Sequence, residues 1–210
     1  MSNPVVWRDL AIAGHEGDEA TARQGVAGPD PVARQIALGA LERMGALTDG
    51  DVDVALGDID PAVRRRAAML AAKRPATDLM PALYDTDATV VEAAAWAAGE
   101  QVQIREISGE TVGEPVLERL IALAGTAPDP QVREAAVASL GSIGDPRGLP
   151  AILAACKDKP AVKRRAVLAL APFEGPEVEA ALAEALTDRD WQVRQAVEDL
   201  LPSAERPHDL

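Results

Sequence analysis

A helix-opening pattern recurs along the chain at intervals close to 30 residues. Its clearest copies are residues 60–64 and 129–133, which read Asp-Pro-Ala-Val-Arg and Asp-Pro-Gln-Val-Arg. Aspartate is a favoured helix N-cap, and proline suits the first helical position because its missing N–H is not needed there. Six copies begin at residues 30, 60, 87, 129, 159 and 190. A period of this length holds two short helices, so the pattern predicts a row of stacked helical hairpins.

The fourth copy indicates what each hairpin contains. Val132, Ala136 and Leu140 recur at helical spacing, which predicts one apolar stripe along the first helix. Gly144 follows this helix, and Asp145 then opens a second helix with the same Asp-Pro chemistry. Two short helices bury little apolar surface alone, so each hairpin needs a neighbour to cover it.

The full repeat combines Asp-Pro-x-Val-Arg, an Ala-rich helix, Gly-Asp-Pro-Arg and a Leu-rich second helix. Over residues 29–201 this combination resembles the short HEAT-like repeat of the phycobilisome lyase group and of bacterial HEAT-repeat proteins. The resemblance implies an all-α fold, a right-handed α-solenoid of about five and a half helical hairpins. It also implies a ladder between repeats, formed by the aspartate before each first helix and the arginine after its valine. We therefore expect structural roles for Arg34, Arg64, Arg133 and Arg194.

The regularity of the repeats sets the predicted organisation of the chain. Residues 1–28 lack the pattern and are predicted to be an irregular N-terminal cap, since solenoids need atypical ends. Residues 29–201 form the predicted solenoid, and residues 202–210 a C-terminal tail. One interval is 42 residues long, which indicates an insertion in the third repeat. The polar, glycine-containing stretch 101–113 is predicted to be a loop that protrudes between two helices.

The net charge of −13 restricts the partners. None of the segments 1–60, 61–126 and 127–210 is net basic, so duplex DNA and anionic membranes are unfavourable partners and nucleic-acid binding is disfavoured. No run of about 18 apolar residues is present, and the first residues do not resemble a signal peptide, so we expect a cytoplasmic protein with no membrane partner. The single Cys156 excludes an internal disulfide.

No residue set predicts catalysis, a metal site or a cofactor. Residues 49–53 read Asp-Gly-Asp-Val-Asp and begin like a calcium loop, but Val54 stands where that loop needs glycine. His15 with Glu16 is a single pair, too few ligands for a metal. Cys156 has no histidine nearby in sequence and is expected to be a small, partly buried thiol. The chain is therefore predicted to be non-enzymatic.

The second helix of each hairpin lines the concave, partner-binding side in HEAT-like proteins. Alignment of these helices on the fourth repeat places a set of side chains on that side, and Trp96, on a first helix, adds an aromatic contact. The predicted partner-binding residues are Asp78, Pro81, Tyr84, Trp96, Glu118, Arg119, Arg147, Lys157, Glu177 and Glu184. Small residues, such as Ala151, would leave a groove suited to a helix or an extended peptide.

The function predicted from these features is that of an adaptor or scaffold. It would present a concave groove to a protein or peptide partner of basic character. A second hypothesis, implied by the resemblance, is an accessory subunit of a modifying enzyme, like the phycobilisome lyases that act on a chromophore-bearing protein. A third and less favoured hypothesis is a nucleic-acid-binding HEAT-like protein.

Overall fold

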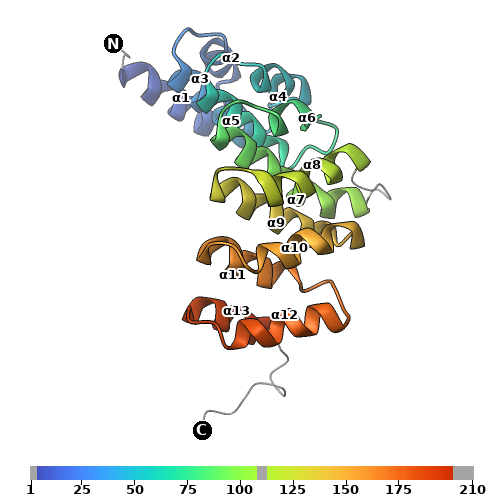
Figure 1. Cartoon of the computed structure of the whole chain (residues 1–210). Coiled ribbons are helices and arrows are strands. Elements are labelled where there is room, and N and C mark those ends of the chain that lie inside the picture. The colour runs from blue at the N-terminus through green and yellow to red at the C-terminus, as the bar shows by residue number, and fades with distance from the viewer. Residues whose placement is uncertain (1–3, 108–112, 201–210) are drawn as a thin grey trace. The chain divides into compact units, whose positions relative to one another are not determined.

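The structure of the chain is a computed structural model that describes residues 4–107 and 113–200. Every regular element within these ranges is a helix (Figure 1). The chain divides into two compact units, Met1–Ala97 and Ala98–Leu210. In each unit short helices pack as layers of antiparallel hairpins, which confirms the predicted all-α solenoid architecture. The hand of the superhelix stays a prediction.

Unit 1 contains a row of first helices and a row of second helices. The first helices are α1 (Pro4–Glu16), α3 (Pro31–Arg43), α5 (Pro61–Ala71) and the beginning of α7 (Ala88–Ile107). The second helices are α2 (Glu19–Val26), α4 (Asp49–Leu56) and the single turn α6 (Met80–Leu83). Helix α3 packs against α1 and α5, while α2 and α4 each pack against the first helix that follows them.

Unit 2 continues the same arrangement. Its first helices are the end of α7, α9 (Pro130–Ile143), α11 (Pro160–Ala169) and α13 (Trp191–Leu200). Its second helices are α8 (Glu114–Thr126), α10 (Leu149–Ala155), preceded by the 3-10 turn η1 (Pro146–Gly148), and α12 (Pro176–Leu186). Helix α11 packs against both α9 and α13, so the first helices form a continuous row within the unit.

Capping explains why the first helices begin where the sequence pattern predicts. Asp30, Asp60 and Asp129 are the N-caps of α3, α5 and α9, and each carboxylate accepts a hydrogen bond from the N–H two residues later. Proline follows each of them at the first helical position. The remaining first helices also begin directly after the predicted positions 87, 159 and 190. Local capping chemistry therefore sets the helix boundaries.

The core is a thin layer of Ala, Val and Leu between the two rows of helices. Leu38, Val137 and Leu140 are fully buried in it. Packing between α9 and α11 is so close that a Cβ on Gly141 would lie 2.7 Å from the Cα of Ala169. Glycine is required there because any side chain would push the two helices apart.

Two predicted segments differ from the structure. Residues 1–28 are not irregular: α1 and α2 form a further hairpin, whose first helix packs on α3. Residues 101–107, predicted as part of a protruding loop, continue helix α7, in which Gln101 and Val102 are buried. Buried apolar positions along α7 outweigh the polar composition that suggested a loop. The remainder of that segment up to 112, and the predicted tail 202–210, lie outside the described residues.

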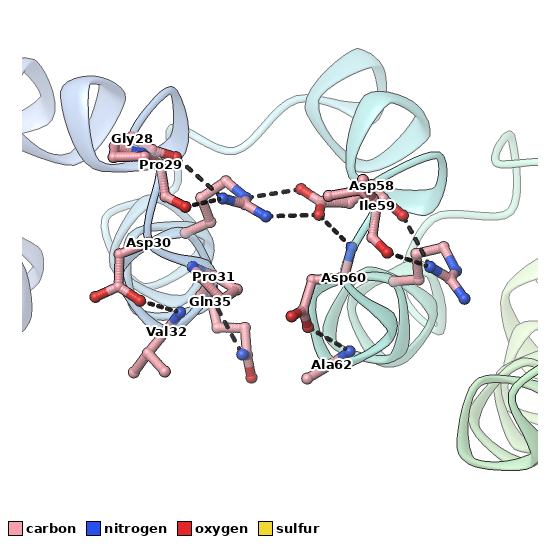
Figure 2. Close-up of polar contacts among 12 residues, drawn as sticks. Gly28, Pro29, Asp30, Pro31, Val32, Gln35, Asp58, Ile59, Asp60 and Ala62 are labelled. Carbon is pink, nitrogen blue, oxygen red and sulfur yellow. Dashed lines mark hydrogen bonds and ion pairs between the residues drawn. The ribbon is translucent and has the colours of Figure 1, made fainter. Parts of the chain in front are cut away.

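An arginine on each of three first helices joins its layer to the next. The Nε and Nη2 atoms of Arg34 on α3 donate to the two carboxylate oxygens of Asp58, each at 2.7 Å. The Nη1 atom of Arg34 donates to the carbonyl oxygens of Gly28 and Pro29, which precede its own helix (Figure 2). Asp58 in turn accepts a hydrogen bond from the N–H of Asp60 at 2.8 Å. We call this arrangement of arginine, two carbonyls and aspartate a rung.

The rung recurs in both units. Arg64 binds Asp85 in the same bidentate way, at 2.6 and 2.8 Å, and Arg133 binds Asp158 at the same two distances. Lys163 makes a single bond of 2.6 Å to Asp188 in the next layer. The acceptor differs from the predicted one, because it is not the capping aspartate. The carboxylate of a capping aspartate accepts from the first turn of its own helix, so an earlier aspartate serves the rung.

Removal of one rung tests its contribution to stability. We expect Arg133→Ala to lower the free energy of unfolding by about 2–4 kcal/mol, because it leaves the Asp158 carboxylate, mostly shielded from solvent, without its ion-pair partner. Urea denaturation measures this loss. The control is Arg65→Ala on α5, an exposed residue, which should change stability by less than about 0.5 kcal/mol. Equal losses for the two variants would contradict a structural role for the rung.

Acid should weaken the rungs. The Arg133 guanidinium lowers the pKa of Asp158, and Arg64 lowers that of Asp85 in the same way. The unfolded chain therefore binds more protons in acid than the folded one, so the stabilisation is complete above about pH 4–5 and is lost as the pH falls below about 4. Urea denaturation between pH 7 and pH 2.5 should show the stability gap between the wild type and Asp158→Asn narrowing towards low pH. A gap that stays constant would contradict this linkage.

Candidate binding surface

The two rows of helices carry different charges. The described second helices contain nine acidic residues and only two basic ones, Arg23 and Arg119. The first helices, α1 included, contain twelve Lys or Arg and nine Asp or Glu. The acidic residues of the second helices are Glu19, Asp49, Asp51, Asp53, Glu114, Glu118, Glu177, Glu179 and Glu184. The negative charge of the helices is thus concentrated on one row, which we call the second-helix face.

Some of these carboxylates are used within the fold. Asp51 completes a capping box with Thr48 at the start of α4 and also accepts a bond of 2.7 Å from Arg23 on α2. Its capping role accounts for the stretch that resembled a calcium loop, since residues 49–53 are helical. Glu114 on α8 pairs with Arg147 of the next layer. These acids are therefore partly neutralised.

Other carboxylates of the second-helix face are exposed and available. Glu118 on α8 and Glu177 and Glu184 on α12 are all exposed. Within residues 4–107 and 113–200, no Lys or Arg forms an ion pair with any of these three. Their side chains can therefore accept bonds from a cationic partner.

The predicted binding residues of unit 1 differ in what they offer. Tyr84 ends the α6 turn with 60% of its surface exposed, and Pro81 beside it is exposed as well. Asp78 is exposed too, but its carboxylate accepts from the N–H of Met80 and so also orders the start of α6. Trp96 is 40% exposed on the first helix α7, in the other row. These residues therefore do not form one surface.

The predicted residues of unit 2 lie on three successive layers. Arg147 is engaged by both Asp145 and Glu114, so its charge is already balanced and it acts as a link between layers. Arg119 is half-buried on α8. Lys157 and Glu184 are the two predicted residues that the structure brings to one cavity, of about 200 Å³, together with Lys163 and Cys156. A continuous groove over both units stays a prediction.

The Cys156 thiol lies in this small cavity without the features of a nucleophile. Burial, with a smaller contribution from the charge of Glu184, raises its pKa to about 11. A thiol with such a pKa is almost entirely protonated near neutral pH, and the thiolate is the reactive form. His15 lies exposed in the last turn of α1. In the part of the chain that the structure describes, no three His, Cys, Asp or Glu side chains gather as metal ligands would.

A larger cavity, of about 390 Å³, opens between α1, α2 and the start of α3. Its walls include Leu10 and Ala33, and the carboxylates of Asp9 and Asp30 lie on its lining. Sequence reasoning missed this site because residues 1–28 were read as irregular. The available signal was residues 3–7, Asn-Pro-Val-Val-Trp, which follow the frame Asp-Pro-Ala-Val-Arg of residues 60–64 with tryptophan in place of arginine.

Comparison with known proteins supports the repeat assignment. A family model of HEAT repeats matches residues 104–161 and 117–201. A search among curated proteins finds no sequence match. None of the described helices is both long and apolar enough to span a membrane.

Similar solved structures are also repeat proteins. The Escherichia coli protein YibA has a TM-score of 0.66 at 15% identity, and the alignment covers 94% of this chain and 73% of YibA. A designed armadillo repeat protein in complex with a (KR)4 peptide has a TM-score of 0.55 at 16% identity, covering 95% of this chain and 98% of the designed one. At these identities the similarity concerns the fold. The matched repeats, the recurring rung and this common architecture identify the chain as a HEAT-like repeat protein.

Proposed function

We propose that this protein is a non-enzymatic adaptor that binds a protein or peptide of basic character on its second-helix face. The observation that carries the proposal is the segregation of charge, with nine acidic and two basic residues on the described second helices. A surface of this charge attracts a cationic partner and disfavours an anionic one. HEAT and armadillo-like repeats commonly serve as protein-binding scaffolds, and the similar designed protein was solved with a (KR)4 peptide.

The proposed contacts combine charge with a few exposed apolar groups. Glu118, Glu177 and Glu184 would accept from Lys or Arg side chains of the partner. Tyr84 and Pro81 would supply apolar contact in unit 1, where a tyrosine buries a large area at a small entropic cost. Peptide backbones in such surfaces lie across successive layers, so one partner would contact several second helices.

The alternative of an accessory subunit in a modification reaction has less support. It would favour a reactive group on the binding face, and the group nearest to that description, Cys156, has a raised pKa and lies partly buried. The expected binding of an unmodified basic peptide separates the two hypotheses, because an accessory factor would need a modified or chromophore-bearing partner.

Charge reversal on the second-helix face tests the adaptor proposal. We expect the wild type to bind an eight-residue (Lys-Arg)4 peptide with an affinity that falls as salt rises. The double variant E118K/E184K should weaken binding by about tenfold or more, because two acceptors are replaced by repelling charges. Isothermal titration calorimetry at 50 and 150 mM NaCl measures the effect.

A matched variant controls for the net charge of the protein. E100K/D199K makes the same change in charge at two exposed positions of the first helices α7 and α13, in the same unit. It should weaken peptide binding by less than about threefold, since distant exposed charges are screened. Equal losses for the two double variants, or no binding by the wild type, would contradict the proposal.

A further inference from the structure

The rung is incomplete in the first layer of the repeat. In the repeat frame, Trp7 of α1 stands where the later layers have Arg34 and Arg64. Gly28 stands where the later layers have Asp58 and Asp85, so the side chains of both rung partners are replaced. The indole Nε1 of Trp7 instead donates to Oδ2 of Asp30 at 2.6 Å. The first layer therefore lacks both the guanidinium and the carboxylate that link the later ones.

The cavity of about 390 Å³ lies at this incomplete rung. Gly28, Pro29 and Asp30 line it, and they form the loop that precedes α3. The apolar part of its wall comes from Leu10, Ala33, Pro29 and the exposed Val6. The space is thus adjacent to the position that a rung aspartate would occupy in a complete layer.

The lining carries negative charge and no positive charge. Two carboxylates, Asp9 and Asp30, belong to it, and no Lys, Arg or His does. Arg34 lies close by, since its Nη1 donates to the carbonyls of Gly28 and Pro29, but its fork is paired with Asp58. Asp9 is exposed on α1, so the negative wall opens to solvent. The cavity therefore favours a cationic group that enters from outside.

We infer that this cavity binds an arginine side chain of a partner protein. The apolar wall fits the methylene stem, and the planar guanidinium can reach carboxylates through several N–H groups. The later layers supply the precedent, because the guanidinium of Arg34, Arg64 and Arg133 is held in each of them by carboxylate and carbonyl oxygens. A partner arginine would supply the group that Trp7 replaces. This inference does not depend on the second-helix face, and either proposal can fail alone.

Titration with a capped arginine tests the inference. The probe is N-acetyl-arginine methylamide, and its neutral counterpart is N-acetyl-citrulline methylamide, which has the same shape without the charge. In the background W96F/W191F, Trp7 is the one remaining tryptophan and reports on the cavity by its fluorescence. We expect saturable binding of the arginine probe, at least about tenfold tighter than that of the citrulline probe. Two-dimensional NMR should place the shift changes on α1, α2 and the start of α3.

Substitutions of the two carboxylates complete the experiment. D9N should weaken binding of the arginine probe by about threefold or more, and D9N/D30N should abolish it, since asparagine can still cap α3. The control D53N removes an exposed carboxylate from α4 and should have no effect, as should E118K/E184K on the second-helix face. Thermal melts verify that each variant is folded, and D9N alone decides the matter if D30N destabilises α3. Absence of saturable binding, equal affinity for citrulline, or full binding by D9N would overturn the inference.

Discussion

The bidentate pair between an arginine of one layer and an aspartate of the next is the contact on which the stacking depends. A thin core of Ala, Val and Leu supplies apolar burial but little that specifies how one hairpin sits on the next. The pair of Arg133 with Asp158 adds direction, because a planar guanidinium meets a carboxylate in few orientations. The two carbonyl bonds of Arg133 hold the same side chain against the loop before its own helix. One residue thus connects its own helix, the preceding loop and the next layer.

This use of arginine has a consequence for the charge of the surface. The rung cations lie on the first helices, where Arg34, Arg64 and Arg133 are matched by aspartates of the loops. The second helices carry acids of their own with few cations beside them. The net charge of −13 is therefore not spread evenly, and part of it gathers on the row of helices proposed here to meet a partner.

The ends of the ladder differ from its middle. At the first layer, Trp7 and Gly28 replace the ion pair, and a cavity lies beside them. At the last described layer, Arg194 on α13 keeps both carbonyl bonds, to Asp188 and Arg189. Within residues 4–107 and 113–200 it has no carboxylate partner, since no further layer follows α13 in that range. Repeat proteins have atypical ends because the outermost layers have one neighbour instead of two.

The sequence by itself determined the helix starts, the hairpin unit and the all-α class, because capping by residues such as Asp60 and Asp129 is a local interaction. It also indicated that the arginines are structural. Only the tertiary structure decided which carboxylate each arginine meets, since Arg34 and Asp58 are 24 residues apart and two aspartates compete in the same loop. The same holds for residues 101–107, whose helical state depends on burial in α7, and for the cavity beside Gly28, which exists only once α1 packs on α3. Local interactions are legible in one dimension, while contacts between layers depend on how the helices pack.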